Sequence, residues 1–373
     1  MFATMSPPAI SGTAVVNITT DSATITWTTD QPSDSLVSYG TTTAYGSTTG
    51  DPTMTTNHSI TVTGLALQTA YHFTVTSNNA YGLSSISTDN TFTTASPITV
   101  TITSPTNGSS ISRPDIMVKG TITNTTGNET GVTVNGVVAN VHGNEFTANH
   151  VPLAEGTNTI TVTAIDTAGY TATASVTVTA STTGNYITIT SNIDSGIATL
   201  EPTLRVDGYA SGTTPSMSYL GPGPVDWTNC ISYDACKVKM TAEGTYYFTA
   251  TGTGTDGNNY QDTIGITVLS RTAMNALLQA KWNGMKTALV NGDIEGAVSY
   301  FADDTKIIYK NKFSTLGSER INAIFASFSD FKLEVFYGQL AECGAIRVEA
   351  DGTFSYPVTL IKDKNGIWKI MGF

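Results

Sequence analysis

The sequence predicts a multidomain fold of three all-β sandwiches in tandem, followed by one α+β domain, and three observations lead to this prediction. The chain has 373 residues, enough for three or four domains. Charged residues make up only 12% of it, whereas Thr, Gly and Asn, which suit strand faces and turns, are frequent. Apolar residues alternate at the period of a strand up to about residue 270 and then recur at the spacing of a helix.

The first sandwich is predicted over residues 1–96. Ile25 and Trp27 alternate with threonines, as in a strand with one buried face. Trp27, followed by Gly64-Leu65 and by Tyr71, resembles the core tryptophan and tyrosine corner of fibronectin type III domains. The segment is most similar to the variant at the N-terminus of purple acid phosphatases. That resemblance implies no active site, because the metal ligands of those phosphatases lie in a separate catalytic domain.

The second sandwich is predicted over residues 97–182. Val132–Gly136 is typical of a strand that ends in a two-residue Asn-Gly turn. The order Asn-Gly, Phe146, Glu-Gly-x-Asn and Asp-x-x-Gly resembles bacterial immunoglobulin-like modules, including the accessory domain of glucodextranase, and this implies a spacer or adhesive role. Asp166 has two interpretations, as a ligand of a structural calcium ion or as a turn residue bonded to its own backbone, and the second is favoured.

The third sandwich is predicted over residues 183–270. Trp227 lies in a loop rich in Gly and Pro, where its ring either stacks on a sugar or, as we favour, fills the core. Cys230 and Cys236 are six residues apart, which predicts a disulfide around a small loop, with two free thiols as the alternative. A disulfide fits an oxidising compartment. No second Cys or His pair follows, so the spacing predicts no metal site.

Residues 271–373 are predicted to fold as helices followed by a sheet. Met274, Leu278 and Met285 recur at helical spacing after Thr272, a suitable N-cap, and Asp293 can cap a second short helix. The remaining elements are expected as a strand at Lys306–Lys310, a helix from Ser318, and four strands at about 331–340, 342–350, 353–362 and 366–372.

This pattern resembles the nuclear transport factor 2-like superfamily, which includes ketosteroid isomerase and polyketide cyclases. The matching residues are Asn291-Gly292-Asp293, Tyr300–Asp304, Gly317 before a helix, and the ending Asn365–Ile370. The resemblance implies a cone-shaped domain, in which a curved antiparallel sheet surrounds an apolar pocket.

Polar groups of such a pocket would be ligand-binding candidates. Strand alternation proposes Tyr309, Tyr337, Arg347, Glu349 and Tyr356. The segment contains no His, and no carboxylate matches the catalytic position of the family, so we predict no catalytic residues. Tyrosines on a sheet face are more often core or interface residues, and Arg347 with Glu349 can equally be a structural ion pair.

The predicted C-terminal sheet is apolar on both faces. Alternation places Phe331, Leu333, Val335 and Tyr337 on one side of the first strand, and Phe336 and Leu340 on the other. The helices can cover only one face, so we expect the second face to pair with another copy of the chain. Cys343 is expected to be buried.

The charge distribution disfavours one class of partner. Residues up to Ser270 contain 5 basic and 18 acidic residues, a net −13, whereas the rest contain 12 basic and 11 acidic residues, a net +1. Because the sandwiches would repel polyanions, the charge distribution disfavours nucleic acid as a partner. No apolar run is long enough for a transmembrane segment. The N-terminal segment Met1–Pro8 lacks the features of a signal peptide, and we favour a mature form or a fragment.

These observations predict a non-catalytic, extracellular or cell-surface bacterial protein. Short linkers suggest that the sandwiches form a rod that serves as a spacer or adhesive array, with no cofactor beyond a possible calcium ion. The C-terminal domain would mediate self-association or hold a ligand, and other surface proteins or glycans are potential partners. The alternatives are an accessory region of an extracellular enzyme acting on carbohydrates or small molecules, and a glycan- or cell-wall-binding array.

Overall fold

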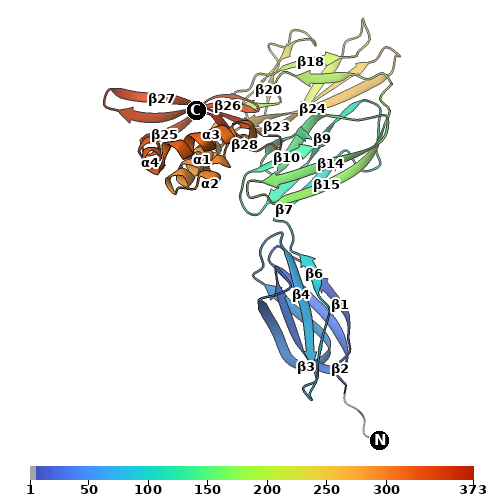
Figure 1. The fold of residues 1–373 in the computed structure, drawn as a ribbon. Helices are drawn as coiled ribbons and strands as arrows, with labels where there is room; N and C mark the ends of the chain where they lie inside the picture. Colours follow the sequence, from blue (N-terminus) through green and yellow to red (C-terminus); the bar gives the residue numbers. More distant parts are fainter. Residues whose placement is uncertain (1–5) are drawn as a thin grey trace. The chain divides into compact units, whose positions relative to one another are not determined.

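A computed structural model describes residues 6–373 and divides the chain into two compact units (Figure 1). The N-terminal unit comprises Met1–Thr99 with Asn124–Gly127, and the second unit comprises Val100–Thr123 with Asn128–Phe373. Most of the N-terminal segment discussed above lies outside the described residues. The sandwiches over residues 97–270, predicted as part of a rod, instead share one compact unit with the C-terminal domain from Val100 onward.

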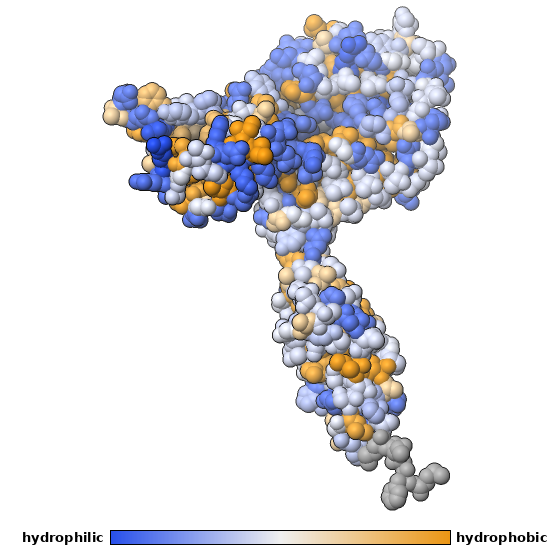
Figure 2. Space-filling view, in the orientation of Figure 1, coloured by the Kyte–Doolittle hydropathy of each residue, from blue (hydrophilic) through white to orange (hydrophobic). Residues whose placement is uncertain are grey.

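The N-terminal unit is a β-sandwich made by one folded sheet. Its strands are β1 (Ile10–Val16), β2 (Ser22–Gly40), β3 (Ser47–Thr63), β4 (Ala70–Asn78), β5 (Ser84–Ile86) and β6 (Asn90–Thr93). The first half of β2 pairs with β1 and its second half with β4, with irregular register between them. Trp27 and Phe73 are buried in the core, and the Tyr71 hydroxyl accepts a 3.0 Å hydrogen bond from the backbone nitrogen of Ala66. Figure 2 shows a mostly pale surface here, as expected where Thr, Ser and Gly predominate.

Two sheets form the middle sandwich, which covers the predicted second domain. One sheet holds β12 (Asn140–His142), β13 (Glu145–Pro152), β9 (Asp115–Asn124) and β7 (Ile98–Ser104), in that order. The other holds β11 (Val137–Val138), β10 (Thr130–Val134), β14 (Gly156–Asp166), β15 (Thr171–Ala180) and β8 (Ser110–Ile111). As predicted, Asn135 and Gly136 form the turn between β10 and β11, both with positive φ.

The third sandwich follows directly in the chain. Its strands are β16 (Thr188–Ser191), β17 (Ser195–Ile197), β18 (Thr203–Asp207), β19 (Ser216–Leu220), β20 (Val225–Asp226), β21 (Cys236–Lys237), β22 (Lys239–Met240), β23 (Gly244–Thr253) and β24 (Asn259–Leu269). The sheets run β16-β18-β21, β17-β24-β23-β19 and β20-β22. Tyr246 and Phe248 are fully buried in the core between them.

The C-terminal part combines four helices with a four-stranded antiparallel sheet. The elements are α1 (Arg271–Val290), α2 (Ile294–Val298), α3 (Asp303–Leu316), α4 (Ser318–Ala326), β25 (Phe328–Tyr337), β26 (Leu340–Glu349), β27 (Gly352–Lys362) and β28 (Trp368–Gly372). The helices cover one face of the sheet, and the β26–β27 hairpin extends past them (Figure 1). Asp293 caps α2 as predicted, but α1 is capped by Ser270 rather than Thr272.

The predicted strand at Lys306–Lys310 is wrong, because these residues lie inside helix α3. Tyr309 and Phe313, four residues apart, are buried on one face, whereas Ile307 and Ile308 are exposed. Asp303 and Asp304 stand in the first turn, where negative charge favours a helix.

A register shift in β25 also corrects the predicted faces of the sheet. The shift lies between Leu333 and Val335, so that Phe336 turns inward and packs on Trp368, with ring centroids 5.6 Å apart. Tyr337 is consequently exposed. The outer face is mixed rather than apolar, since Glu334 lies on it and accepts a hydrogen bond from Ser355.

Candidate functional site

The residues predicted as one pocket occupy separate places. Tyr309 is buried in the core, where its hydroxyl donates to the backbone oxygen of Phe373 and accepts from the backbone nitrogen of the same residue, both at 2.9 Å. Its place on α3 rather than on a strand removes it from the sheet face that alternation assigned to it.

Arg347, Glu349 and Tyr356 do come together, on the hairpin of β26 and β27. Arg347 Nε lies 3.1 Å from Glu349 Oε1, and the Tyr356 hydroxyl donates to that same oxygen at 3.0 Å. The hydrogen bond to Glu349 raises the pKa of Tyr356 above its usual range. These contacts satisfy the charges of the cluster among themselves.

The remaining predicted residues of the third sandwich pack within it. Trp227 is half-buried against the core, with its ring 5.8 Å from that of Phe248. Cys230 and Cys236 form a disulfide, with Cα atoms 4.0 Å apart.

In the C-terminal core, burial raises the pKa of the Cys343 thiol to about 12.

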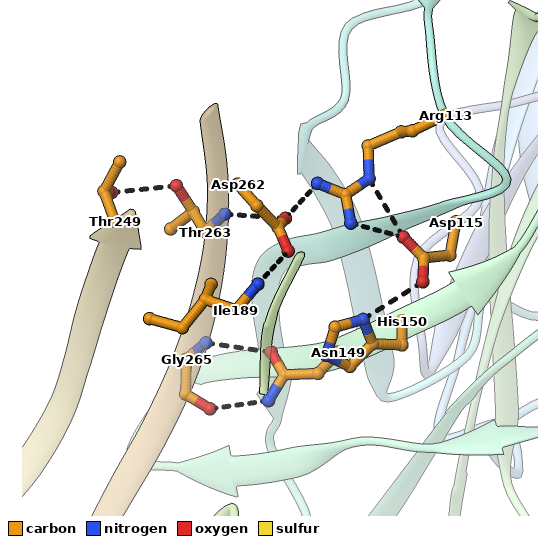
Figure 3. Close-up of polar contacts among 9 residues, drawn as sticks. All are labelled: Arg113, Asp115, Asn149, His150, Ile189, Thr249, Asp262, Thr263 and Gly265. Atoms are coloured by element: carbon orange, nitrogen blue, oxygen red, sulfur yellow. Dashed lines mark hydrogen bonds and ion pairs between the residues drawn. The ribbon is translucent and has the colours of Figure 1, made fainter. Parts of the chain in front are cut away.

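A buried charge cluster joins the middle and third sandwiches, and sequence reasoning missed it (Figure 3). Arg113, only 9% exposed, forms an ion pair through Nη1 with Asp262, which is 6% exposed. The Nε and Nη2 atoms of Arg113 donate to Asp115 Oδ1 at 2.9 and 2.7 Å. Asp262 also accepts from the backbone nitrogens of Ile189 (2.9 Å) and Thr263 (2.7 Å). Each buried charge therefore has opposite charge and hydrogen-bond partners, as burial requires.

A bulge in β13 brings a second pair of polar side chains to the same junction. The register of β13 against β9 shifts between Ala148 and Val151. At this bulge Asn149 points to Gly265 of the third sandwich and His150 points to Asp115 (Figure 3). The Asn149 amide donates to the backbone oxygen of Gly265 and accepts from its nitrogen, both at 2.8 Å. A Cβ at Gly265 would lie 2.5 Å from Thr147 Cγ2, so the two backbones approach closely because this residue is glycine.

His150 completes the cluster and makes it sensitive to pH. Its Nδ1 atom lies 3.1 Å from Asp115 Oδ2, and this hydrogen bond raises the pKa of His150 above its usual value. Burial acts to raise the pKa of Asp115, but the hydrogen bond from His150 and the charge of Arg113 hold it below its usual range. Burial raises the pKa of Asp194, which also faces His150.

We expect the second unit to lose stability as the pH rises from 6 to 8. The raised pKa of His150 means that its contribution is fully present below its unfolded value of about 6.5 and is lost as the pH rises through the folded value. Arg113, Asp115, Asp262 and Asp194 face the imidazole, so deprotonation leaves three carboxylates with one cation. Melting temperatures at the two pH values measure this effect.

The matched variants for the pH experiment are His150→Asn and His142→Asn. Asn tolerates the positive φ of 50° at His150, so the first variant removes the imidazole with little backbone strain. His150→Asn should reduce the fall in melting temperature between pH 6 and 8. His142→Asn, on β12 of the same sandwich, should leave that fall unchanged. An equal pH dependence in the wild type and His150→Asn would contradict the assignment.

A second buried ion pair joins the middle sandwich to the C-terminal domain. Glu129 Oε2 pairs with Lys281 of α1, a residue only 7% exposed, and Glu129 Oε1 accepts from the backbone nitrogen of Trp368 at 3.0 Å. A Cβ at Gly131 would lie 2.1 Å from the backbone oxygen of Asn365, which shows how closely the two backbones approach. Burial and the nearby charge of Lys281 lower the pKa of Lys369.

The third sandwich and the C-terminal domain also share a core. Leu269, the last residue of β24, belongs to the core of the C-terminal domain, and Ile197 of β17 packs against it. The tight turn at Gly338, between β25 and β26, approaches Ser195. All three pairs of domains in the second unit are therefore in contact.

A polar cavity of about 490 Å³ lies where these three domains meet. Its lining residues are Val137, Val138, Asn140, Thr147, Asn149, Ser191, Asn192, Ile193, Asp194, Ser195, Tyr337, Gly338 and Gln339. Tyr337, the last residue of β25, is thus the one predicted ligand-binding residue that lines this cavity.

Comparison with known protein families finds a match for one segment of the chain. Residues 97–182 match the family model described as glucodextranase, domain B. The N-terminal unit and this segment are both β-sandwiches. No curated protein matches the chain.

Solved structures share only low overall similarity with the chain. The FN1–FN3 domains of chicken CNTN1 are 13% identical, with a TM-score of 0.22, over 70% of this chain and 99% of that one. Fibronectin(III)-like modules of Clostridium thermocellum CbhA are 15% identical, with a TM-score of 0.19, over 46% and 95%. A structure of a bacterial ice-binding adhesin is 16% identical, with a TM-score of 0.19, over 71% and 98%. Such low scores support no conclusion about function.

Two kinds of feature are absent from residues 6–373. In that range no group of three or more His, Cys, Asp or Glu side chains is arranged to hold a metal ion. No helix there is both long and apolar enough to cross a membrane. Asp166 accepts hydrogen bonds from the backbone nitrogens of Ala168 (2.9 Å) and Tyr170 (3.0 Å), the arrangement favoured for it above.

Proposed function

We propose that this chain is a non-catalytic binding module of a secreted or cell-surface protein, in which residues 100–373 act as one rigid body. The observation that carries the proposal is the pair of buried ion pairs, Arg113–Asp262 and Glu129–Lys281, that join its domains. Domains within one chain ordinarily move relative to each other unless their interface is extensive. Separating these domains would also break the Asn149–Gly265 hydrogen bonds and expose the shared apolar core at Leu269, so the body should keep its surfaces in a fixed relation.

Three features support an extracellular binding role. The Cys230–Cys236 disulfide suits an oxidising compartment. The acidic, charge-poor sandwiches suit solubility rather than nucleic-acid binding. In the C-terminal domain, the Arg347, Glu349 and Tyr356 cluster has the contacts of a structural ion pair rather than of an acid and a base facing a substrate.

The match of residues 97–182 favours a second candidate function. Its model is named for a domain of glucodextranase, so the chain would be an accessory region of an extracellular carbohydrate-active enzyme. The nuclear transport factor 2-like assignment of residues 271–373, and their self-association through the sheet, also stay proposals. Such pairing would bury the exposed side chains of Val348 and Met371 on the C-terminal strands.

Calorimetry of the full chain tests the rigid body. We expect residues 100–373 to unfold in a single cooperative transition, because buried contacts couple all three domains, and the N-terminal unit to give a separate one. The transition of the N-terminal unit serves as the internal reference. Resolution of the second unit into two or three independent transitions would refute the proposal.

A further inference from the structure

The cavity at the meeting point of the three domains exists only when they are assembled. Val138 and Asn140 come from the middle sandwich, Asn192 and Asp194 from the third, and Tyr337 from the C-terminal domain. Its volume of about 490 Å³ lies within the range of small-molecule sites, roughly 300–1,000 Å³. Because Tyr337 is 62% exposed at its rim, a ligand can enter from solvent.

Several polar groups that line the cavity have bonding capacity to spare. Asn140 uses its Nδ2 atom to donate to the backbone oxygen of Asp194, and Asn192 uses its Oδ1 atom to accept from the backbone nitrogen of Thr203. Within residues 6–373, no protein partner is found for the other end of either amide, or for the Gln339 side chain. These groups can donate to and accept from a ligand that does both.

The lining discriminates between classes of ligand. It contains no Lys, Arg or His, and the Asp194 carboxylate would repel an anion. An apolar ligand would leave the amides and the carboxylate without hydrogen bonds. Calcium takes six to eight oxygen ligands, and Asp194 is the one carboxylate in this lining. A neutral polyhydroxyl compound fits, because its hydroxyls match amides and a carboxylate.

Tyr337 adds the feature that points to a sugar ring rather than to a simple polyol. An aromatic ring at the mouth of a polar cavity offers a flat apolar face next to hydrogen-bond groups. A sugar ring likewise combines apolar C–H groups on its faces with hydroxyl groups around its edge. We propose that this cavity binds a sugar unit of a neutral glycan, with Tyr337 stacked on the ring and Asp194, Asn140 and Asn192 bound to its hydroxyls; the inference rests on the proposed function as a binding module.

A neutral-glycan array, followed by titration calorimetry of the best ligand, tests the inference on the full chain. We expect Tyr337→Ala and Asp194→Asn each to weaken binding about tenfold. The control is Tyr81→Ala, which removes an equally exposed tyrosine from the N-terminal unit and should leave binding unchanged. Unchanged melting of the second unit in Tyr337→Ala would show that the loss is not a folding defect.

The other outcomes each overturn the inference. Glycan binding that Tyr337→Ala and Asp194→Asn leave intact would place the sugar site elsewhere, and the binding module would stand. If the chain binds no neutral glycan, this ligand class is excluded. The proposal of a rigid body is then tested by calorimetry alone. A rise in melting temperature with calcium chloride, abolished by Asp194→Asn and without glycan binding, would make the cavity a cation site.

Discussion

Arg113→Met is expected to lower the free energy of unfolding of residues 100–373 by about 3–5 kcal/mol, the usual effect of removing one partner from a buried ion pair. Methionine retains an apolar stem of similar length, so the variant chiefly removes the charge. It leaves Asp262, 6% exposed, with its two backbone donors but without a cation, and Asp115 with His150 alone. Calorimetry and urea denaturation of the second unit measure the loss.

Two further variants separate charge from packing in this experiment. Arg205→Met removes the same charge from the exposed Arg205–Asp207 pair of the third sandwich and should have little effect. Combining Arg113→Met with Asp262→Asn removes both charges, and the double variant should recover part of the lost stability, since no unpaired buried carboxylate remains. Equal losses of unfolding free energy in Arg113→Met and Arg205→Met would show that the buried Arg113–Asp262 pair stabilises the unit no more than an exposed pair does.

Local patterns were sufficient to predict one turn of the middle sandwich and one helix cap of the C-terminal domain. The Asn135-Gly136 turn follows from a dipeptide that tolerates positive φ, and the capping of α2 follows from Asp293. The strand predicted at Lys306–Lys310 failed because adjacent β-branched residues, Ile307 and Ile308, suggest a strand, although the helix exposes both. The buried period of four from Tyr309 to Phe313 was the signal that favoured a helix.

The junctions between domains could not be predicted in the same way. Arg113 and Asp262 lie in different sandwiches, and no periodicity within either segment relates them. The bulge that turns Asn149 and His150 outward likewise leaves no mark in an alternating pattern. The composition gives one weak signal. Residues up to Ser270 contain only five basic residues, so each of them is a candidate partner for a buried carboxylate. The cavity depends on these junctions, and so only Tyr337 among its lining residues was predicted.

Glu129→Gln is the variant expected to loosen the C-terminal domain from the middle sandwich, with a loss of about 3–5 kcal/mol. Glutamine keeps an oxygen that can accept from the backbone nitrogen of Trp368, so the hydrogen bond can survive while the charge is lost. Lys281, 7% exposed, then remains buried without its carboxylate, beside the like charge of Lys369. In calorimetry, the single transition of the second unit should move to lower temperature and broaden or split.

A double variant distinguishes a charge effect from a packing effect. Combining Glu129→Gln with Lys281→Met removes both charges, so the double variant should recover part of the lost stability. The matched control is Glu295→Gln, which breaks the exposed Lys310–Glu295 pair of the same domain and should change little. A double variant no more stable than Glu129→Gln would mean that Glu129 acts by shape. Because Glu129 and Arg113 join different pairs of domains, the two variants should also weaken the glycan site at their common meeting point, without touching any residue that lines it.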